Sequence, residues 1–308
     1  MYESMREHSS DFHIYIFAFD NLTFDILTQL KLDYATVISL EEFENQELLE
    51  VKKRRTVAEY CWTCTPSTIR FALANFNIPS CTYIDSDLFF YSDPAILINE
   101  LIDNAKEVLI TEHRYSFLPA IHALKKAGRF CVQFITFKNT DESLKVLEKW
   151  RTQCIDWCYS RYEDGKFGDQ KYLDDWPKTY SNIHILKNQG GGIAPWNLSQ
   201  YIFSKISDSI FGRVKRTNET FSVVFFHFQY VKFLDDNFCD LGWYKITRSN
   251  RILFYIPYIK KIKVIESRLK ALNNNYRTGL TILKADSLKN YLKIVLKKTF
   301  NYNIISSS

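Results

Sequence analysis

Short apolar runs alternate with amphipathic segments along the first 160 residues of the chain. Runs of this length that end at polar residues predict buried strands, and apolar positions three and four residues apart predict helices. The predicted strands are residues 13–19, 35–40, 80–84, 107–111 and 130–138. The predicted helices are residues 24–32, 66–75, 96–105 and 143–159, with Pro66 at a helix start. This alternation predicts a layered α/β domain with a mostly parallel sheet, in which ligands bind beyond the carboxyl ends of the strands.

Two carboxylates stand one residue apart where a predicted strand ends, in the run Tyr83-Ile84-Asp85-Ser86-Asp87. Because successive side chains of a strand point to opposite faces, Asp85 and Asp87 are expected on the same side. Two oxygen ligands there can hold Mg²⁺ or Mn²⁺ and leave coordination positions for the oxygens of a diphosphate. The alternative is an ordinary turn at a strand end, where Asp is common. Asp20 falls at another predicted strand end.

Two further segments carry side chains that suit a sugar ligand. Asp169 and Gln170 follow Gly168 and can both face a cleft, where they would hydrogen-bond sugar hydroxyls. The alternative for Asp169 is an N-cap on a surface helix. Trp196 and Asn197 follow three consecutive glycines, which permit close approach of the backbone to a ligand. Trp196 either offers a flat apolar face to a sugar ring or packs in the core.

His227 interrupts an apolar run at residues 223–228, and Lys232 follows five residues later. A histidine in such a run is a core residue unless a metal lies nearby, in which case neutral imidazole suits Mn²⁺. Lys232 can neutralise a phosphate. Cys61 and Cys64 form a Cys-x-x-Cys pair that fits zinc ribbons poorly, and their apolar neighbours indicate buried structural thiols.

Composition limits the class of protein. The chain has 308 residues, 46% of them hydrophobic, which is enough for a substantial core. The chain contains no run of 18 apolar residues, so no transmembrane helix is predicted, and the polar start does not resemble a signal peptide. Seven cysteines without an export signal predict reduced thiols and a cytoplasmic protein.

The net charge of +5 is unevenly divided along the chain. From Arg251 to the end, 12 Lys and Arg face two acids, a net of +10, so that residues 1–250 carry −5. Lysine pairs mix with aliphatic residues at 260–265 and 291–298. This pattern favours a helix lying on an anionic membrane surface, with nucleic-acid contact and a solvated helical subdomain as alternatives. We therefore expect a body at 1–250 and a basic amphipathic region at 251–308.

Together the motifs resemble a known family. The segments that carry the resemblance are Phe19-Asp20, Cys64-Thr65-Pro66-Ser67, Tyr83 to Asp87, Gly168-Asp169-Gln170, Gly191 to Asn197 and Phe226-His227-Phe228. Over residues 1–235 their order is similar to bacterial nucleotide-sugar glycosyltransferases of the GT-A fold, in particular glycosyltransferase family 8 and its relatives in surface-polysaccharide synthesis. The resemblance implies a Rossmann-like mixed α/β sheet with flanking helices, followed by a basic helical C-terminal appendage.

The resemblance also implies roles for single residues. The implied metal ligands, for Mn²⁺ or Mg²⁺, are Asp85, Asp87 and His227. The implied donor-binding residues are Asp20, Asp85, Asp87, Lys232, Trp196 and Asn197. Asp169 would contact the donor sugar, and Gln170 would lie on its reactive face.

The implied activity is transfer of a hexose from a nucleoside-diphosphate sugar, UDP-linked in our interpretation, with retention of configuration. The acceptor would be a glycan or a lipid-linked glycan of surface polysaccharide or lipopolysaccharide, reached from the cytoplasm or at the inner face of the cell membrane, with no nucleic-acid partner.

The chain departs from the family pattern in three places. The family usually opens with a strand that cradles the nucleotide, whereas this chain opens in what we expect to be the following helix. Cys131 and Gln133 stand where the family often has Asn and Gly, and Tyr230 replaces a Gly of the family, with Lys232 one residue early. The alternative function is therefore a GT-A-like domain that binds a sugar or nucleotide without turnover.

Overall fold

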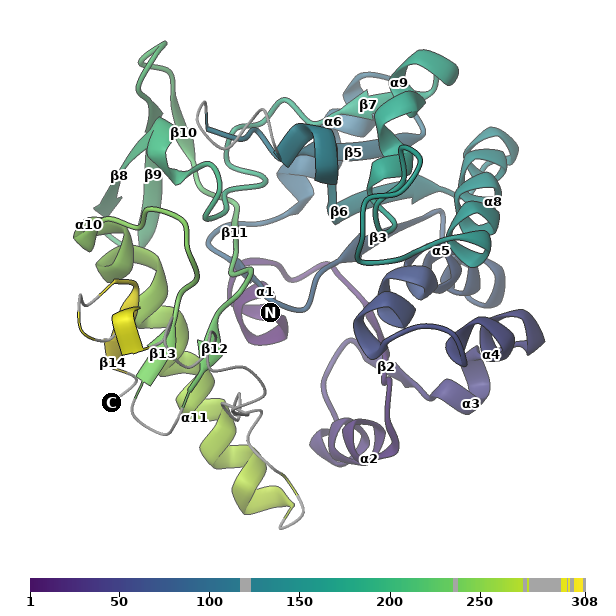
Figure 1. Ribbon diagram of the computed structural model, residues 1–308, viewed down its shortest axis with the longest axis horizontal. Helices are drawn as coiled ribbons and strands as arrows, with labels where there is room; N and C mark the ends of the chain where they lie inside the picture. Colours follow the sequence, from purple (N-terminus) through teal and green to yellow (C-terminus); the bar gives the residue numbers. More distant parts are fainter. Residues whose placement is uncertain are drawn as a thin grey trace.

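The computed structural model describes residues 1–116, 123–234, 238–273, 276, 295–297, 299 and 302–306. The chain forms a mixed α/β structure with several small sheets, which confirms the predicted class at that level. Helices α5 and α8 flank the largest sheet, and strands β8 to β10 and helix α11 lie on the other side of the molecule (Figure 1). Among the described residues, every helix is too short or too polar to cross a membrane.

The largest sheet has four strands in the order β3-β6-β5-β7 and is mixed rather than mostly parallel. Strand β6 runs antiparallel to both neighbours, and β5 pairs with β7 in parallel. Eight of the nine residues of β6 are buried, because helices cover one face and the rest of the molecule covers the other. The bounds are β3 Ser80–Ile84, β5 Val108–Glu112, β6 Phe130–Lys138, β7 Ile183–Ile185, α5 Val57–Asn75, α6 Ala95–Asp103, α8 Asp141–Asp156, η1 Lys171–Asp175 and α9 Trp176–Thr179.

A separate pair of parallel strands follows the N-terminal helix α1. Strands β1 and β2 pair with each other, and aromatic side chains from β1 pack with Phe43 and Phe71 of the neighbouring helices. The bounds are α1 Tyr2–His8, β1 Ile14–Phe17, α2 Asn21–Leu30, β2 Ala35–Ile38, α3 Leu40–Phe43 and α4 Gln46–Lys52.

Antiparallel units are built mainly from strands that follow residue 185. Strand β11 pairs with the short strand β4, and β8, β9 and β10 form a separate sheet. The phenyl rings of Phe226 and Phe254 stack at 4.7 Å, so this core continues across residue 250 into the C-terminal helices. The division at residue 250 remains a prediction. The bounds are β4 Leu88–Phe90, η2 Leu198–Gln200, β8 Tyr201–Ile206, β9 Ser209–Val214, β10 Thr220–Ser222 and β11 Phe225–His227.

The described part of the C-terminal region packs on the body. Lys261 of α11 pairs with Glu3 and Glu7 of α1, so part of the basic surface of α11 is neutralised within the molecule. The second basic stretch expected at residues 291–298 lies outside the described residues except for 295–297. The bounds are β12 Lys232–Phe233, β13 Phe238–Asp240, α10 Arg248–Asn250, the π-helix η3 Arg251–Tyr255, α11 Ile256–Leu272 and β14 Ile304–Ser306.

One predicted helix start is wrong. Pro66 lies inside α5, which begins nine residues earlier at Val57 behind a capping box formed by Thr56 and Glu59. The reciprocal bonds of that box satisfy N–H groups at the helix start. Proline removes one backbone hydrogen bond from a helix interior. Helix α5 continues through this defect because packing against β3 and α8 holds it on both sides of Pro66.

Candidate metal centre

Three side chains from distant parts of the chain converge beside β4. Asp85 and Asp87 lie in the turn between β3 and β4, and His227 ends β11. Because β11 runs antiparallel to β4, His227 stands opposite Leu88, the residue after Asp87. His227 Nε2 lies 3.1 Å from Asp87 Oδ1 and 3.6 Å from Asp85 Oδ2. The strand pairing therefore brings residues 140 positions apart into one cluster.

The turn, not the alternation along a strand, directs the two carboxylates. Strand β3 ends at Ile84, and the N–H of Leu88 closes the turn by donating to the carbonyl of Asp85 at 3.2 Å. The hydroxyl of Tyr83 donates to Asp85 Oδ1 at 2.9 Å. Both carboxylates face one site, as predicted. The predicted cause, alternation of side chains along a strand, was wrong.

Burial and charge act against each other at these groups. Burial raises the pKa of Asp85, and the charge of Asp87 adds to this rise while His227 opposes it. Burial alone would raise the pKa of Asp87 too, but the ion pair with His227 outweighs burial and lowers it. Burial alone would lower the pKa of His227, but the Asp87 and Asp85 carboxylates raise it well above its usual value. The cluster therefore favours a positive charge between its carboxylates.

The donor set fits a divalent cation. One oxygen from each carboxylate and one ring nitrogen lie within 4.8 Å of one another. Neighbouring ligands of an octahedral Mg²⁺, with bonds of about 2.1 Å, are separated by about 3.0 Å. The distance of 3.1 Å from His227 Nε2 to Asp87 is close to this value, and that of 3.6 Å to Asp85 is longer. Two carboxylates and an imidazole suit Mn²⁺ as well, and three protein ligands leave positions for other oxygens.

Asp169 lies close enough to the cluster for the charge of Asp85 to act on its carboxyl. The Asp169 side chain is buried. Burial, followed by the charge of Asp85, raises the pKa of Asp169 to about 7. Trp150 Nε1 donates to the backbone carbonyl of Asp169 at 2.8 Å and fixes this segment. Asp169 is therefore not the exposed helix cap of the alternative interpretation; it faces the interior.

Gln170 lies at the start of the 3₁₀ helix η1, and its Nε2 donates to the carbonyl of Ala127 at 2.8 Å. This bond fixes the orientation of the amide. Among the described residues, no donor is bonded to Gln170 Oε1. The role of this oxygen toward a donor sugar stays a prediction.

Trp196 and Asn197 lie in the interior beside His227. The indole of Trp196 meets the imidazole of His227 edge-on at 5.4 Å, and its Nε1 donates to the carbonyl of His113 at 2.7 Å. The side-chain amide of Asn197 donates to the carbonyls of His113 and Gly192 and accepts from the N–H of Ala194. Asn197 therefore holds the end of the glycine loop and Trp196 the segment at His113, and their predicted contact with a donor stays a prediction.

Asp20 and Lys232 are not in the cluster. Asp20 caps α2, with Oδ1 accepting from the N–H of Thr23 at 2.7 Å and Oδ2 from its hydroxyl. The exposed Lys232 places Nζ over the ring of Tyr230 at 4.6 Å. Their predicted roles toward a donor stay predictions.

The comparisons with known proteins identify relatives. No protein-family model matches the chain. The uncharacterized protein YfnD of Bacillus subtilis is 30% identical over 269 residues, which cover 85% of this chain and 83% of YfnD. This chain belongs to the same family as YfnD. The uncharacterized protein YfnF of the same organism is 31% identical over 210 residues, covering 66% of this chain and 69% of YfnF.

One solved structure shows a weak likeness. The apo crystal structure of mouse xyloside xylosyltransferase 1 matches with a TM-score of 0.38 and 14% identity, over 63% of this chain and 78% of that chain. A likeness of this size decides neither the fold nor the function of this member of the YfnD family.

Two residues of the site escaped the sequence analysis. The guanidinium of Arg114 donates to four backbone carbonyls of the loop at residues 186–191, those of Leu186, Asn188, Gln189 and Gly191. His113, next to it, is buried against Trp196. Both follow strand β5 directly, at the same edge as the metal ligands, and position at a strand end was the signal available for them.

Proposed function

We propose that this chain is a metal-dependent glycosyltransferase that moves a hexose from a nucleoside-diphosphate sugar, UDP-linked in our interpretation, to a glycan acceptor. The observation that carries the proposal is the meeting of Asp85, Asp87 and His227 within 4.8 Å, with the buried Asp169 beside Asp85. A cation held by two carboxylates and one imidazole, with open positions, suits a diphosphate. The order of these motifs along the chain supports the GT-A arrangement and the resemblance to family 8.

The residues divide the chemistry among them. Asp85, Asp87 and His227 would hold Mn²⁺ or Mg²⁺, and that cation would neutralise charge on the leaving diphosphate when bound. Asp169 would accept a hydrogen bond from a donor-sugar hydroxyl, or donate one when protonated. Gln170 Oε1 would face the anomeric centre. An amide oxygen is a weak nucleophile, so we favour attack by the acceptor hydroxyl on the same face, which retains the configuration.

The acceptor is proposed to be a lipid-linked glycan at the inner face of the cell membrane, in surface polysaccharide or lipopolysaccharide synthesis. The exposed face of α11 supports this, because the exposed Lys260 lies along it with the exposed Ile256 and Val264, although Arg268 on the same helix pairs with Glu3. A helix with basic and aliphatic residues on its outer face suits an anionic bilayer surface.

Calorimetry with UDP and Mn²⁺, followed by a donor-hydrolysis assay with UDP-hexoses, tests the proposal. We expect UDP to bind only with the metal, and hydrolysis to stop on chelation with EDTA. Asp87→Asn should lower Mn²⁺ affinity by more than the ~10–100-fold that loss of an outer-shell partner causes. The control is Glu142→Gln, because Glu142 is an exposed carboxylate that pairs with Lys145.

The outcomes separate the two functions. Metal-dependent binding without hydrolysis of any donor would favour the alternative, a binding domain without turnover. Hydrolysis that is unchanged by EDTA and by Asp87→Asn contradicts the metal-dependent mechanism. With an acceptor in hand, NMR of the anomeric proton reports the stereochemistry, and an inverted product contradicts the retaining assignment.

A further inference from the structure

One buried residue bonds to both sides of the candidate metal centre. Gln133 lies in β6, and its backbone carbonyl accepts from the N–H of Asp85 at 3.1 Å. Its side-chain Oε1 lies 2.6 Å from His227 Nδ1. The Gln133 side chain is fully buried, so these contacts are made away from bulk water. A single residue thus links the turn that carries the carboxylates to the histidine.

The chemistry of the imidazole fixes the direction of the second bond. His227 Nε2 faces Asp85 and Asp87, so Nε2 is the nitrogen that reaches a cation. A neutral imidazole that coordinates through Nε2 carries its proton on Nδ1 and needs an acceptor there. The amide of Gln133 must therefore present its oxygen to His227 and turn its nitrogen away.

In this orientation the amide nitrogen of Gln133 is left without a hydrogen-bond acceptor among the described residues. This nitrogen, Nε2, is buried. A buried donor without a partner is unfavourable, because it has lost its hydrogen bonds to water and gained none in return. The space for this nitrogen exists because residue 192 is glycine: a Cβ there would lie 3.2 Å from Gln133 Nε2 and 2.9 Å from Thr111 Cγ2. The φ of Gly192, +90°, also favours glycine.

We propose that Gln133 is a positioning residue of the metal centre, which holds His227 in the Nδ1–H tautomer and aims Nε2 at the cation. The inference rests on the proposed metal site, and it names a side chain that the motifs of the proposed function do not include. Partners of this kind orient the ligating imidazole and raise its basicity, and losing one costs about 10–100-fold in metal affinity.

Two substitutions of Gln133 distinguish its role as a hydrogen-bond acceptor from a role in packing alone. Gln133→Met keeps the length of the side chain and removes the acceptor, whereas Gln133→Glu keeps an acceptor oxygen. The proposal expects Mn²⁺ affinity, measured by calorimetry or by the EPR signal of free Mn²⁺, to fall about 10–100-fold in Gln133→Met. Gln133→Glu should bind Mn²⁺ at least as tightly as the natural chain. Thr111→Val keeps the shape of the side chain next to Gly192 and removes the hydrogen bond of Thr111 Oγ1 to the carbonyl of Phe134. It does not touch His227 and should leave the affinity unchanged.

The results distinguish the failure of this inference from that of the proposed function. If the natural chain does not bind Mn²⁺, the metal site itself is wrong and the role of Gln133 falls with it. If the natural chain binds Mn²⁺ and Gln133→Met binds equally well, or Gln133→Glu loses as much affinity as Gln133→Met, the positioning role is overturned.

A second measurement does not depend on the folding of a variant. In the ¹⁵N-histidine-labelled natural chain loaded with Zn²⁺ as a diamagnetic probe, the proposal expects His227 to carry its proton on Nδ1 and the metal on Nε2. The opposite arrangement overturns it.

Discussion

Burial shifts the pKa values of two side chains near the site in opposite directions. Burial and then the charge of Asp85 raise the pKa of the Asp169 carboxyl to about 7, so this group titrates around neutral pH. The imidazole of His113 is held neutral there, with its pKa lowered to about 3 by burial first and then by the nearby His227. In both cases the interior disfavours the charged form. Near neutral pH His113 therefore adds no charge to the cluster, and Asp169 adds part of one negative charge.

His113 predicts an acid-dependent loss of stability. Its folded pKa of about 3 lies below the ordinary value of 6.5, so its contribution is present above pH 6.5 and is lost as the pH falls toward 3. His113→Phe keeps a ring to stack on Tyr115, and the carbonyl of Arg129 still accepts from the backbone N–H of residue 113. Between pH 7 and pH 5 the natural chain should lose about 2 kcal/mol more unfolding free energy than the variant. Urea unfolding at both pH values measures this, and parallel pH profiles would contradict it.

At the scale of elements, the sequence pattern predicted where most strands and helices lie. It was less successful in predicting why each one begins and ends where it does. Strand β6 has the predicted bounds of 130–138, because an uninterrupted apolar run suits a strand buried on both faces. The start of α5 was misplaced because Pro66 is locally a start signal, and only packing against β3 and α8 explains a helix that continues through it. The cluster of Asp85 with Asp87 was predictable, whereas the link from Gln133 to His227 depends on which strands pair.

The loop at residues 186–191 depends on one arginine. Each terminal nitrogen of Arg114 donates to two loop carbonyls, at 3.0–3.3 Å. Arg114→Lys keeps the charge but loses the fork, so we expect the unfolding free energy to fall by about 2–3 kcal/mol. Hydrogen exchange of the amides at 186–191 should also become faster. Arg161→Lys, at an exposed pair with Glu163, is the control and should change stability by less than about 0.5 kcal/mol. Unchanged exchange in the loop would show that other contacts hold it.

At the scale of the whole molecule, the site lies where two groups of strands meet. Asp85 and Asp169 come from the part built on the four-stranded sheet, whereas His227 comes from the part that shares a core with the C-terminal helices. The connection between β13 and α10 is held by residues from the end of the chain. The side chain of Asn303 donates to the carbonyls of Gly242 and Tyr244. Tyr244 in turn packs against the cluster of Cys131, Ala194 and Trp196, and Trp196 lies beside His227. The C-terminal end thereby supports a wall of the site.

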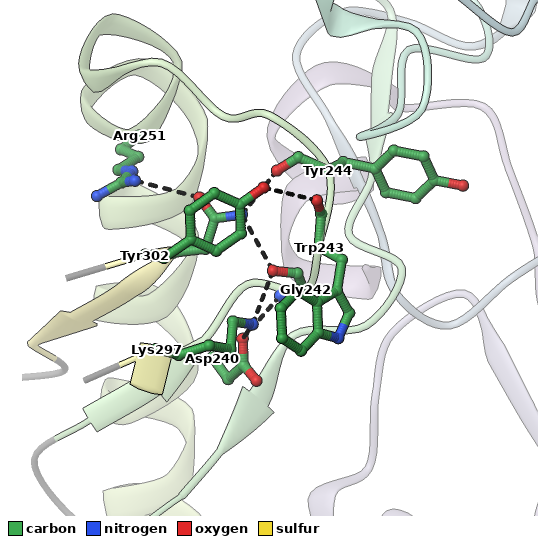
Figure 2. A network of polar contacts seen from close by, with 8 residues as sticks. Asp240, Gly242, Trp243, Tyr244, Arg251, Lys297 and Tyr302 are labelled. Atoms are coloured by element: carbon green, nitrogen blue, oxygen red, sulfur yellow. Dashed lines mark hydrogen bonds and ion pairs between the residues drawn. The ribbon is translucent and has the colours of Figure 1, made fainter. Parts of the chain in front are cut away.

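A buried ion pair is the centre of this support. Figure 2 shows Lys297 bonded to Asp240 and to the carbonyl of Gly242, with Nζ 4.3 Å from the ring centre of Trp243. Both charged side chains are almost completely buried. Removing one partner leaves the other charge buried and unpaired, so Lys297→Met should lower the unfolding free energy by about 3–5 kcal/mol.

The double variant tests whether that loss comes from the unpaired charge. Asp240→Asn removes the charge and still accepts from the N–H of Gly242, so adding it to Lys297→Met should restore most of the lost stability. Urea unfolding followed by tryptophan fluorescence measures all three variants. A double variant whose loss equals the sum of the two single losses would mean that Lys297 acts through packing on Trp243 rather than through its charge. In that case the connection to Tyr244, and with it the wall of the site, would be held by the Asn303 bonds instead.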